Sequence, residues 1–369
     1  MRKLLIWLHK WLGIVSGIVI MIICLSGAFL SFERELMPLS IGKKYYASVV
    51  TDQSLPLDRI NGRIREQFPE RDVTTMTIAE NPQRNMIVRF ADEPQTDVYV
   101  NPYTGSIEGT FNYGDSFFGV MRRIHRYLLL DKTGKVITGS CSILFSLILL
   151  SGLWIFLTHR KGSVAGLFRI RWKKGGMALL YDLHVVPGII AMLFLLLMSL
   201  TGPFWSFDWY NKAIYNIFGM NTSQVSRSKG APEKVKVKEL TPEQFEMIRH
   251  SVDRITPFSE GWKEVEVTLP TMKKDEYSLS VKPYRVLHGR QSDLYTYSAQ
   301  EGKLLKSALF KDKTFKDNFR IWIFAIHSGS WGGLTTKILY FLAVLVGFSL
   351  PLTGYLFWWK KRRKSYRNL

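Results

Sequence analysis

The sequence predicts a membrane protein, mainly α-helical, with four transmembrane helices from a tandem duplication and two small α+β domains outside the cytoplasm. Three observations lead to this fold class. Four apolar stretches are each long enough to cross about 30 Å of hydrocarbon. Long polar segments separate the first stretch from the second and the third from the fourth. The first stretch also recurs later in the chain, which indicates a structural unit used twice.

The apolar stretches and the polar segments between them define the expected domains. The first stretch is expected to be a retained helix and not a cleaved signal peptide, because it is longer than a signal core and an internal segment repeats it. The predicted order is transmembrane helix 1 over 1–32, an extracytoplasmic domain over 33–135, transmembrane helix 2 over 136–158, a cytoplasmic loop over 159–184, transmembrane helix 3 over 185–207, a second extracytoplasmic domain over 208–337, transmembrane helix 4 over 338–359 and a basic cytoplasmic tail over 360–369.

The repeat keeps its register. Residues 9–32 (HKWLGIVSGIVIMIICLSGAFLSF) recur without a gap at 184–207 (HVVPGIIAMLFLLLMSLTGPFWSF), 175 positions later. A second offset of 202 positions relates His125 to His327 and also relates LLSGLWIF to PLTGYLFW in the spans that follow. The sequence therefore predicts two copies of one unit, each made of a span, an outer domain, a second histidine and another span.

Charge predicts the orientation. The short segments 1–10, 159–183 and 360–369 carry 3, 6 and 6 Lys or Arg residues and only one acid, Asp182, which accounts for +14 of the formal charge of +20. The positive-inside rule places these segments, and thus both chain ends, in the cytoplasm. We expect a multi-pass protein of the bacterial cytoplasmic (inner) membrane whose basic residues meet anionic lipid. Nucleic acid is not an expected partner.

Each outer segment has the pattern of one helix on a small antiparallel sheet. Residues 57–68 have helical spacing, and alternating residues over 74–100 predict strands that end in the turn NPYTG. The second segment repeats the plan with a helix at 241–255 and strands in WKEVEVTLP and EYSLSVKPY, followed by LYTYSAQEGKLLKS, which resembles VYVNPYTGSIEGT of the first segment.

Four histidines lie at span ends in two matched pairs. His9 and His184 open spans of the same design from the cytoplasmic side, whereas His125 and His327 precede spans on the outer side. Paired imidazoles at a membrane boundary suit a b-type haem whose iron is held from both sides. Ionisable groups at membrane depth are functional candidates by default.

Two glycines support this hypothesis. Gly13 and Gly188 lie one helical turn after His9 and His184, where the missing side chain leaves room for a flat ring beside the imidazole. The alternative is that each histidine is an interfacial side chain that contacts a headgroup or a carbonyl. A zinc ion is not expected, because the histidines are divided between two membrane faces.

Other candidate residues have simpler interpretations. His159 occupies a position whose counterpart is Lys361, so it is expected to be a basic flank; Cys24 and Cys141 belong to no metal-binding pattern. Tryptophans at span ends form an aromatic belt, and the repeated Ser-Gly and Thr-Gly pairs fit close helix packing in lipid. His250 and His288 are expected at the surface. Four arginines near the outer histidines could pair with haem propionates or form a solvated rim: Arg122, Arg123, Arg126 and Arg320.

The chain resembles the PepSY-associated transmembrane proteins, which include inner-membrane ferric-siderophore reductases. The likeness rests on HKWLG with LSG, the segment ending VYVNPYTG, RRIHRYLL, DLHVVPG with LTG, and FAIHSGSWGG, and it covers nearly the whole chain. The resemblance implies PepSY-like outer domains and two non-covalent, bis-histidine haems b with His9, His184, His125 and His327 as ligands.

The family is functionally mixed, so the resemblance does not specify the substrate. We expect an oxidoreductase that carries electrons across the membrane from the cytoplasmic side to an acceptor outside, with a ferric siderophore as the leading acceptor. Reduction to ferrous iron weakens binding by hard oxygen ligands. The sequence carries no nicotinamide or flavin fingerprint, since GLFRIRWKKGG lacks GxGxxG, so the donor is expected to be another protein, a quinol or a diffusible reductant. The alternatives are a cofactor-free PepSY binding or regulatory module and a transporter.

Overall fold

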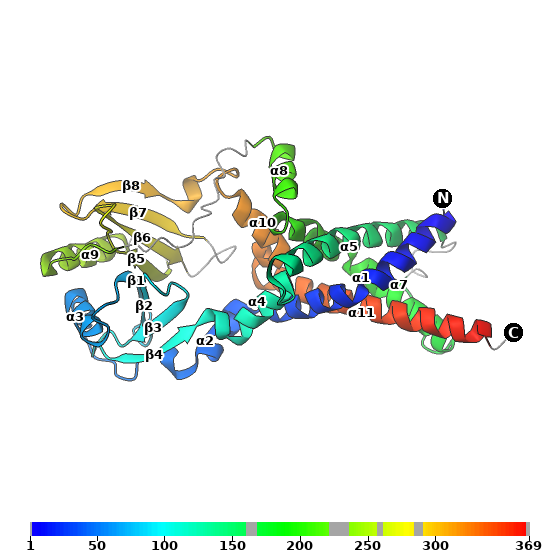
Figure 1. Cartoon of the computed structure of the whole chain (residues 1–369), viewed down its shortest axis with the longest axis horizontal. Helices are drawn as coiled ribbons and strands as arrows, with labels where there is room; N and C mark the ends of the chain where they lie inside the picture. Colours follow the sequence, from blue (N-terminus) through cyan, green and yellow to red (C-terminus); the bar gives the residue numbers. More distant parts are fainter. Residues whose placement is uncertain (1, 160–167, 221–235, 257–260, 284–290, 367–369) are drawn as a thin grey trace. The chain divides into compact units, whose positions relative to one another are not determined.

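The computed structural model describes residues 2–159, 168–220, 236–256, 261–283 and 291–366. These residues form two compact units, a membrane unit (1–34, 120–226 and 320–369) and a sheet unit (35–119 and 227–319). The elements are shown in Figure 1. The outer domains were expected to end at residues 135 and 337, but the two stretches of the sheet unit end at residues 119 and 319. The segments that carry His125 and His327 therefore belong to the membrane unit.

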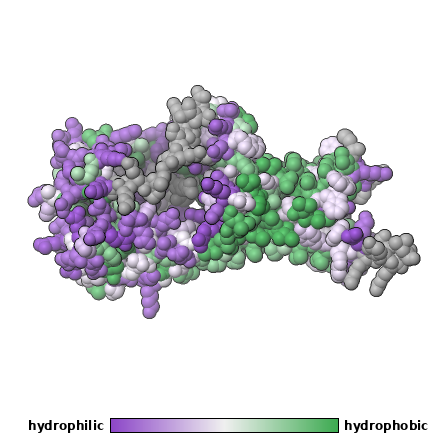
Figure 2. Space-filling view, in the orientation of Figure 1, coloured by the Kyte–Doolittle hydropathy of each residue, from purple (hydrophilic) through white to green (hydrophobic). Residues whose placement is uncertain are grey.

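The membrane unit is built on four long helices, α1 (Arg2–Ser31), α5 (Asp131–His159), α7 (Gly176–Thr201) and α11 (Gly333–Tyr366). Each is long and apolar enough to cross a membrane, which confirms the four expected spans. Figure 2 shows hydrophobic residues over much of the face of this unit that is in view. The protein is therefore a membrane protein whose helices contact lipid.

The four spans form a bundle in which α1 packs against α5 and α11, and α7 packs against the same two helices. Both chain ends lie at one end of this bundle (Figure 1), which we call the terminal end, and the other is the far end. Three shorter helices complete the described part of the unit: α4 (Phe117–Tyr127), α8 (Asp208–Ile217) and α10 (Phe319–Ser328). Two of these, α4 and α10, begin at the boundary of the sheet unit.

An apolar core fills the middle of the bundle. It includes Ile20, Cys24, Phe145, Leu195 and Val344, all of which are buried. Both cysteines of the chain are buried and free. One close helix crossing lies beside this core, where the Tyr355 hydroxyl donates a 2.7 Å hydrogen bond to the Ile14 carbonyl. Gly17 permits that approach, because a Cβ there would lie 2.6 Å from the same hydroxyl oxygen.

The sheet unit contains one eight-stranded antiparallel sheet in the order β4-β3-β2-β1-β5-β6-β7-β8. The strands are β1 (Val73–Ala79), β2 (Met86–Phe90), β3 (Thr96–Val100), β4 (Ile107–Asn112), β5 (Trp262–Thr268), β6 (Glu276–Pro283), β7 (Asp293–Ser298) and β8 (Leu304–Ala308). Strands β1, β2, β3, β5 and β6 lie where the alternation of residues predicts them, whereas β4 follows the NPYTG turn, where no strand is predicted. The expectation of two separate sheets is not met, because β1 and β5 pair from Thr75↔Thr268 to Ala79↔Glu264.

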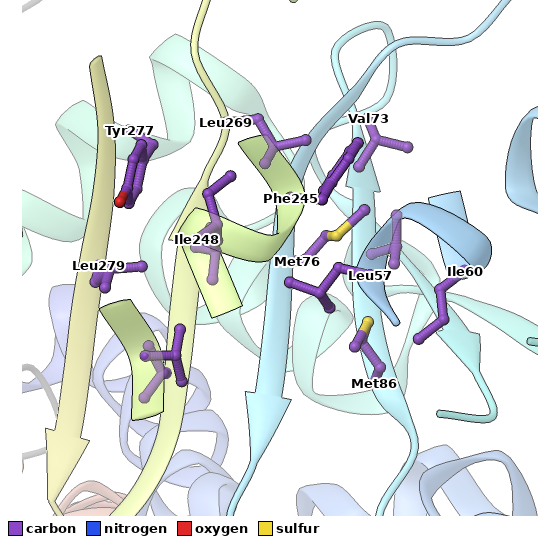
Figure 3. Close-up of a cluster of buried hydrophobic side chains, with 14 of the residues drawn as sticks. Leu57, Ile60, Val73, Met76, Met86, Phe245, Ile248, Leu269, Tyr277 and Leu279 are labelled. Atoms are coloured by element: carbon purple, nitrogen blue, oxygen red, sulfur yellow. The ribbon is translucent and has the colours of Figure 1, made fainter. Parts of the chain in front are cut away.

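The central pairing has a physical reason. A four-stranded half with one helix would leave the edge of β1 or β5 unpaired, and exposed edges promote association with other chains. Joining the halves removes both edges and merges two small cores. The helices α3 (Leu57–Gln67) and α9 (Pro242–Ile255) lie against the sheet and contribute Ile60 and Ile248 to this shared core, which is drawn in Figure 3.

Local features of the sheet unit follow the sequence closely. The helix α9 begins at a capping box, in which the Thr241 hydroxyl accepts from the Gln244 backbone and the Gln244 side chain accepts from the Thr241 backbone. In the NPYTG turn, the Asn101 side chain accepts from the backbone of Tyr103 and Thr104. The turn ends at Gly105, whose φ of +70° is a conformation that favours glycine.

Ion pairs join the two halves on the face of the sheet opposite this core. Arg84 Nη1 lies 3.2 Å from Glu264 Oε2, and Arg89 Nη1 lies 3.2 Å from Glu266 Oε2. Lys282 completes the group at 3.1 Å from Glu264. On the same side, Ile41 is buried with Ile87 and Tyr99; it belongs to α2 (Glu33–Ile41).

Candidate functional site

The structure brings the four histidines together in the two pairs expected. The rings of His9 and His184 have centroids 6.2 Å apart and planes at 88°. Those of His125 and His327 have centroids 6.1 Å apart and planes at 62°. We call these the terminal pair and the far pair, after the ends of the bundle at which they lie.

The terminal pair draws on all four spans. His9 is on α1 and its Nδ1 lies 3.1 Å from the Ile148 carbonyl oxygen on α5. His184 is on α7 and its Nδ1 lies 3.1 Å from the Leu350 carbonyl oxygen on α11. The ring of His9 is therefore held against α5 and that of His184 against α11. The two rings meet between α1 and α7.

The far pair draws on the shorter helices. His125 is on α4 and its Nδ1 lies 2.9 Å from the Ile23 carbonyl oxygen on α1. His327 is on α10 and its Nδ1 lies 3.1 Å from the Met198 carbonyl oxygen on α7. Ile23 follows His9 by 14 residues on α1 and Met198 follows His184 by 14 residues on α7, so the pairs lie about 20 Å apart along the bundle.

Each histidine also contacts a hydroxyl three residues after the carbonyl it binds. The distances from Nδ1 to the hydroxyl oxygen are 3.0 Å for Ser151 at His9 and 2.9 Å for Thr353 at His184. They are 3.4 Å for Ser26 at His125 and 2.9 Å for Thr201 at His327. Each hydroxyl belongs to one of the four Ser/Thr-Gly pairs: Ser26-Gly27, Ser151-Gly152, Thr201-Gly202 and Thr353-Gly354.

The hydrogen bonds fix the tautomer of all four imidazoles. A backbone carbonyl can only accept, so Nδ1 must carry the proton. The hydroxyls point the same way, since each donates its own proton to a carbonyl of its helix, as Ser151 does to Ile148 at 2.8 Å and Thr201 does to Leu197 at 2.6 Å. Nε2 on the other side of the ring then keeps its lone pair, which is the form of histidine that binds metals.

The glycine of each pair lies beside the imidazole. A Cβ on Gly27 would lie 3.0 Å from Cε1 of His125, and one on Gly152 would lie 3.1 Å from Cε1 of His9. A Cβ on Gly202 would lie 3.8 Å from Cε1 of His327, and one on Gly354 would lie 3.7 Å from Cε1 of His184. Helix packing alone was the expected role of these pairs, whereas the structure places every one of them against a histidine.

The site therefore contains four hydroxyl residues that were expected to serve helix packing and not to contact the histidines. A signal for them was present. The two offsets that relate the histidines also relate the residues that contact their Nδ1 atoms. Ile23 and Met198 are 175 residues apart, and 202 residues separate Ile148 from Leu350 and Ser151 from Thr353. This correspondence is the one that a tandem duplication predicts.

The two glycines expected beside the cofactor differ in their surroundings. A Cβ on Gly13 would have no atom within 4 Å outside its own helix, whereas one on Gly188 would lie 3.1 Å from Leu350 Cδ2. Gly13 thus has the open space that a flat ring needs. Gly188 instead permits close packing of α7 against α11.

The connection after α4 holds His125 in place. Leu128, Leu129 and Asp131 have positive φ values of 49°, 59° and 45°, which non-glycine residues rarely adopt. Gly134 permits this tight link, because a Cβ there would overlap the Tyr127 carbonyl. Thr138 Oγ1 donates to the Arg126 carbonyl at 2.9 Å, which ties the start of α5 to the end of α4. Strained backbone of this kind is often found at functional sites.

The other candidate residues lie as follows. Arg122 pairs with Glu33 at 2.8 Å, and Arg123, Arg126 and Arg320 are exposed. Trp205, expected in the aromatic belt, lies with its ring 5.2 Å from that of His327.

The remaining histidines contribute no described contact to either pair. His250 is an exposed residue of α9 near Glu246, as expected. The side chain of His159 and the whole of His288 lie outside the described residues.

The spacing of the two rings in each pair fits the ligation of an iron porphyrin. Iron–nitrogen bonds of about 2 Å place the centroids of two imidazoles that share one iron roughly 6 Å apart, as in both pairs. Within the described residues, no three His, Cys, Asp or Glu side chains converge as a metal site. A porphyrin supplies the four equatorial nitrogens, so two protein ligands complete its iron.

Comparison with known proteins places the chain in a family. A search of curated proteins found no match to it. A family model described as the PepSY-associated TM region matches residues 6–361, which is nearly the whole chain. The protein with these two histidine pairs therefore belongs to the PepSY-associated transmembrane family.

Proposed function

We propose that this protein is a di-haem b oxidoreductase of the bacterial cytoplasmic membrane. In this proposal it carries electrons from the cytoplasmic side to the outside and reduces the iron of ferric siderophores there. The observation that supports it most is the geometry of the two histidine pairs, with centroids 6.2 and 6.1 Å apart and with Nδ1 of all four rings hydrogen-bonded. A cofactor-free binding module or a transporter has no need of two such pairs.

The proposed orientation follows from charge. The terminal end of the bundle carries the basic residues at the start of α1 and at the end of α11, and positive residues stay in the cytoplasm. His9 and His184 then form the cytoplasmic-side ligand pair and His125 and His327 the outer pair. The sheet unit and its PepSY-like halves lie outside, where they can meet an acceptor.

The residues present would hold each haem iron through Nε2 of two histidines. Bound haem supplies a one-electron couple between ferric and ferrous iron that needs no change of ligands. The carbonyls and the Ser/Thr-Gly pairs would keep both imidazoles of each pair in one tautomer, which would also raise their basicity as ligands. The apolar core that includes Ile20, Leu195 and Val344 excludes water from the space between the two pairs.

A ferric siderophore is the acceptor we favour. Siderophores bind ferric iron through hard oxygen ligands, and the added electron gives ferrous iron, which such ligands bind less well. The product is therefore released iron and a free chelator. The electron comes from a cytoplasmic reductant or a membrane quinol, each of which is oxidised in the exchange.

Proteoliposomes test this function. The full-length protein is reconstituted with a reductant inside and a ferric siderophore outside, and ferrous iron is detected outside with a membrane-impermeant ferrous chelator. We expect His9→Ala and His125→Ala each to abolish reduction, whereas His250→Ala, on the surface of the sheet unit, reduces iron at the wild-type rate. Wild-type rates in the His9→Ala and His125→Ala proteins would rule out the function.

A further inference from the structure

The two histidine pairs differ in the angle between the ring planes. It is 88° in the terminal pair and 62° in the far pair. The contacts of Nδ1 determine this angle, since a ring attached to a helix can still rotate about its Cβ–Cγ bond. A carbonyl and a hydroxyl oxygen together define the direction in which Nδ1–H points, and the neighbouring glycine limits the position of Cε1.

The strength of this restraint varies between the four rings. At the terminal pair, both hydroxyl contacts are short, 3.0 Å for Ser151 and 2.9 Å for Thr353. At the far pair, Thr201 is equally close at 2.9 Å, but Ser26 lies 3.4 Å from His125. A hydrogen bond of 3.4 Å lies beyond the usual range. His125 thus depends mainly on the Ile23 carbonyl and on Gly27.

We propose that the four Ser/Thr-Gly pairs are positioning elements that set the angle between the axial imidazole planes at each haem. This inference rests on the proposed function and adds to it the cause of a difference between the two haems. The ring planes are nearly perpendicular in the terminal pair and closer to parallel in the far pair. Helix packing in lipid, which these pairs also serve, would not require a hydroxyl opposite each histidine.

The angle has a measurable consequence. In low-spin ferric haem, perpendicular imidazole planes leave two iron d orbitals nearly equal in energy, which makes the electron paramagnetic resonance (EPR) signal most anisotropic. Rotation toward parallel planes separates those orbitals and lowers the largest g value. The haem of the terminal pair should therefore show the larger maximum g value.

EPR of the oxidised full-length protein tests this inference, and absorbance gives the haem content of each sample. We expect two low-spin signals. The one that disappears in His9→Ala should have the larger maximum g value, and the one that disappears in His327→Ala the smaller. Two coincident signals, or the reverse order, would overturn the inference while leaving the proposed function intact. A protein without haem would instead overturn both.

Hydroxyl variants test the positioning role directly. Ser151→Ala and Thr353→Val should shift only the signal of the terminal pair. Ser151→Thr and Thr353→Ser keep the hydroxyl and should leave that signal at its wild-type g values. The matched control is Ser16→Ala, because the Ser16 hydroxyl is buried on α1 but donates to the Leu12 carbonyl and not to a histidine. Unchanged spectra in both hydroxyl-free variants, or an equal shift in Ser16→Ala, would overturn the proposal.

The far pair provides a second test within the same protein. Thr201→Val should shift the far-pair signal more than Ser26→Ala does, because the Thr201 contact is 2.9 Å and the Ser26 contact is 3.4 Å. An equal or larger shift in Ser26→Ala would contradict the argument from distance.

Discussion

His9 and His184 are 175 residues apart in the sequence, yet their ring centroids lie 6.2 Å apart in the bundle. Nδ1 of each ring contacts a backbone carbonyl of a different span, on α5 for His9 and on α11 for His184. A shared iron between them would therefore link all four spans.

Removal of one histidine should remove one haem. His327→Ala takes a ligand from the far pair and leaves the terminal pair intact about 20 Å away, so we expect about half of the haem to remain. His9→Ala should remove the other half. Haem content per protein, measured after extraction, checks both variants. Loss of both haems or of neither in His327→Ala contradicts the pairing.

Two equivalent glycines should respond differently to alanine. A Cβ on Gly152 would lie 3.1 Å from the His9 ring, closer than ordinary contact, whereas one on Gly354 would lie 3.7 Å from the His184 ring. We expect Gly152→Ala to weaken haem binding at the terminal pair about tenfold, the usual effect of disturbing a residue behind a metal ligand. Gly354→Ala should bind haem with an affinity within about twofold of that of the wild type. Titration of the haem-free protein with haem measures both, and equal affinities would refute the difference.

His159 serves as a negative test among the histidines. Its counterpart under the 202-residue offset is Lys361, which indicates a basic flank at this position. We expect the absorption spectrum of His159→Ala to match that of the wild type in both oxidation states. A missing or shifted band would mean that a ligand on the terminal side has been assigned wrongly.

The stability of the sheet unit should fall in acid because of Glu264. Burial raises the pKa of this carboxyl, but Lys282 and Arg84 outweigh that effect and hold the pKa below its usual value. A lowered folded-state pKa means that the stabilisation is complete above the unfolded pKa of about 4.3 and is lost as the pH falls through the folded pKa.

Replacement of this carboxylate should remove that acid sensitivity. We expect Glu264→Gln to destabilise the sheet unit by about 3 kcal/mol at pH 7, because it leaves Arg84 buried without its charged partner. Hydrogen exchange of β5 and β6 in the full chain, measured from pH 7 to pH 3, records both effects. Glu276→Gln, at an exposed position of β6, is the control. A variant as stable and as acid-sensitive as wild type would show that Glu264 is not responsible.

Local patterns predicted much of this structure. The four spans follow from runs of apolar residues, and the helix beginning at Pro242 follows from Thr241, Gln244 and the spacing of residues after them. The offset of 175 residues between His9 and His184 and that of 202 residues between His125 and His327, each of which also relates two spans, predicted which histidines meet. These features depend on residues close together in sequence or on a repeat that can be counted.

The pairing of β1 with β5 could not be predicted in the same way. Alternation shows that Thr75 and Thr268 lie in strands but does not show which strands are neighbours, because every strand presents the same hydrogen-bonding groups. The role of Ser151 and Thr353 was missed for a related reason. Small residues in membrane spans usually serve packing, and the hydroxyl contact with a histidine exists only once two helices are placed together.

The haem content of the purified protein tests the central claim most directly. A pyridine haemochrome assay and reduced-minus-oxidised spectra give the type and number of haems per chain. We expect two non-covalent haems b per chain, with a sharp Soret band that shifts on reduction. A colourless protein, after expression in cells with ample haem, would contradict the claim that the paired histidines are haem ligands.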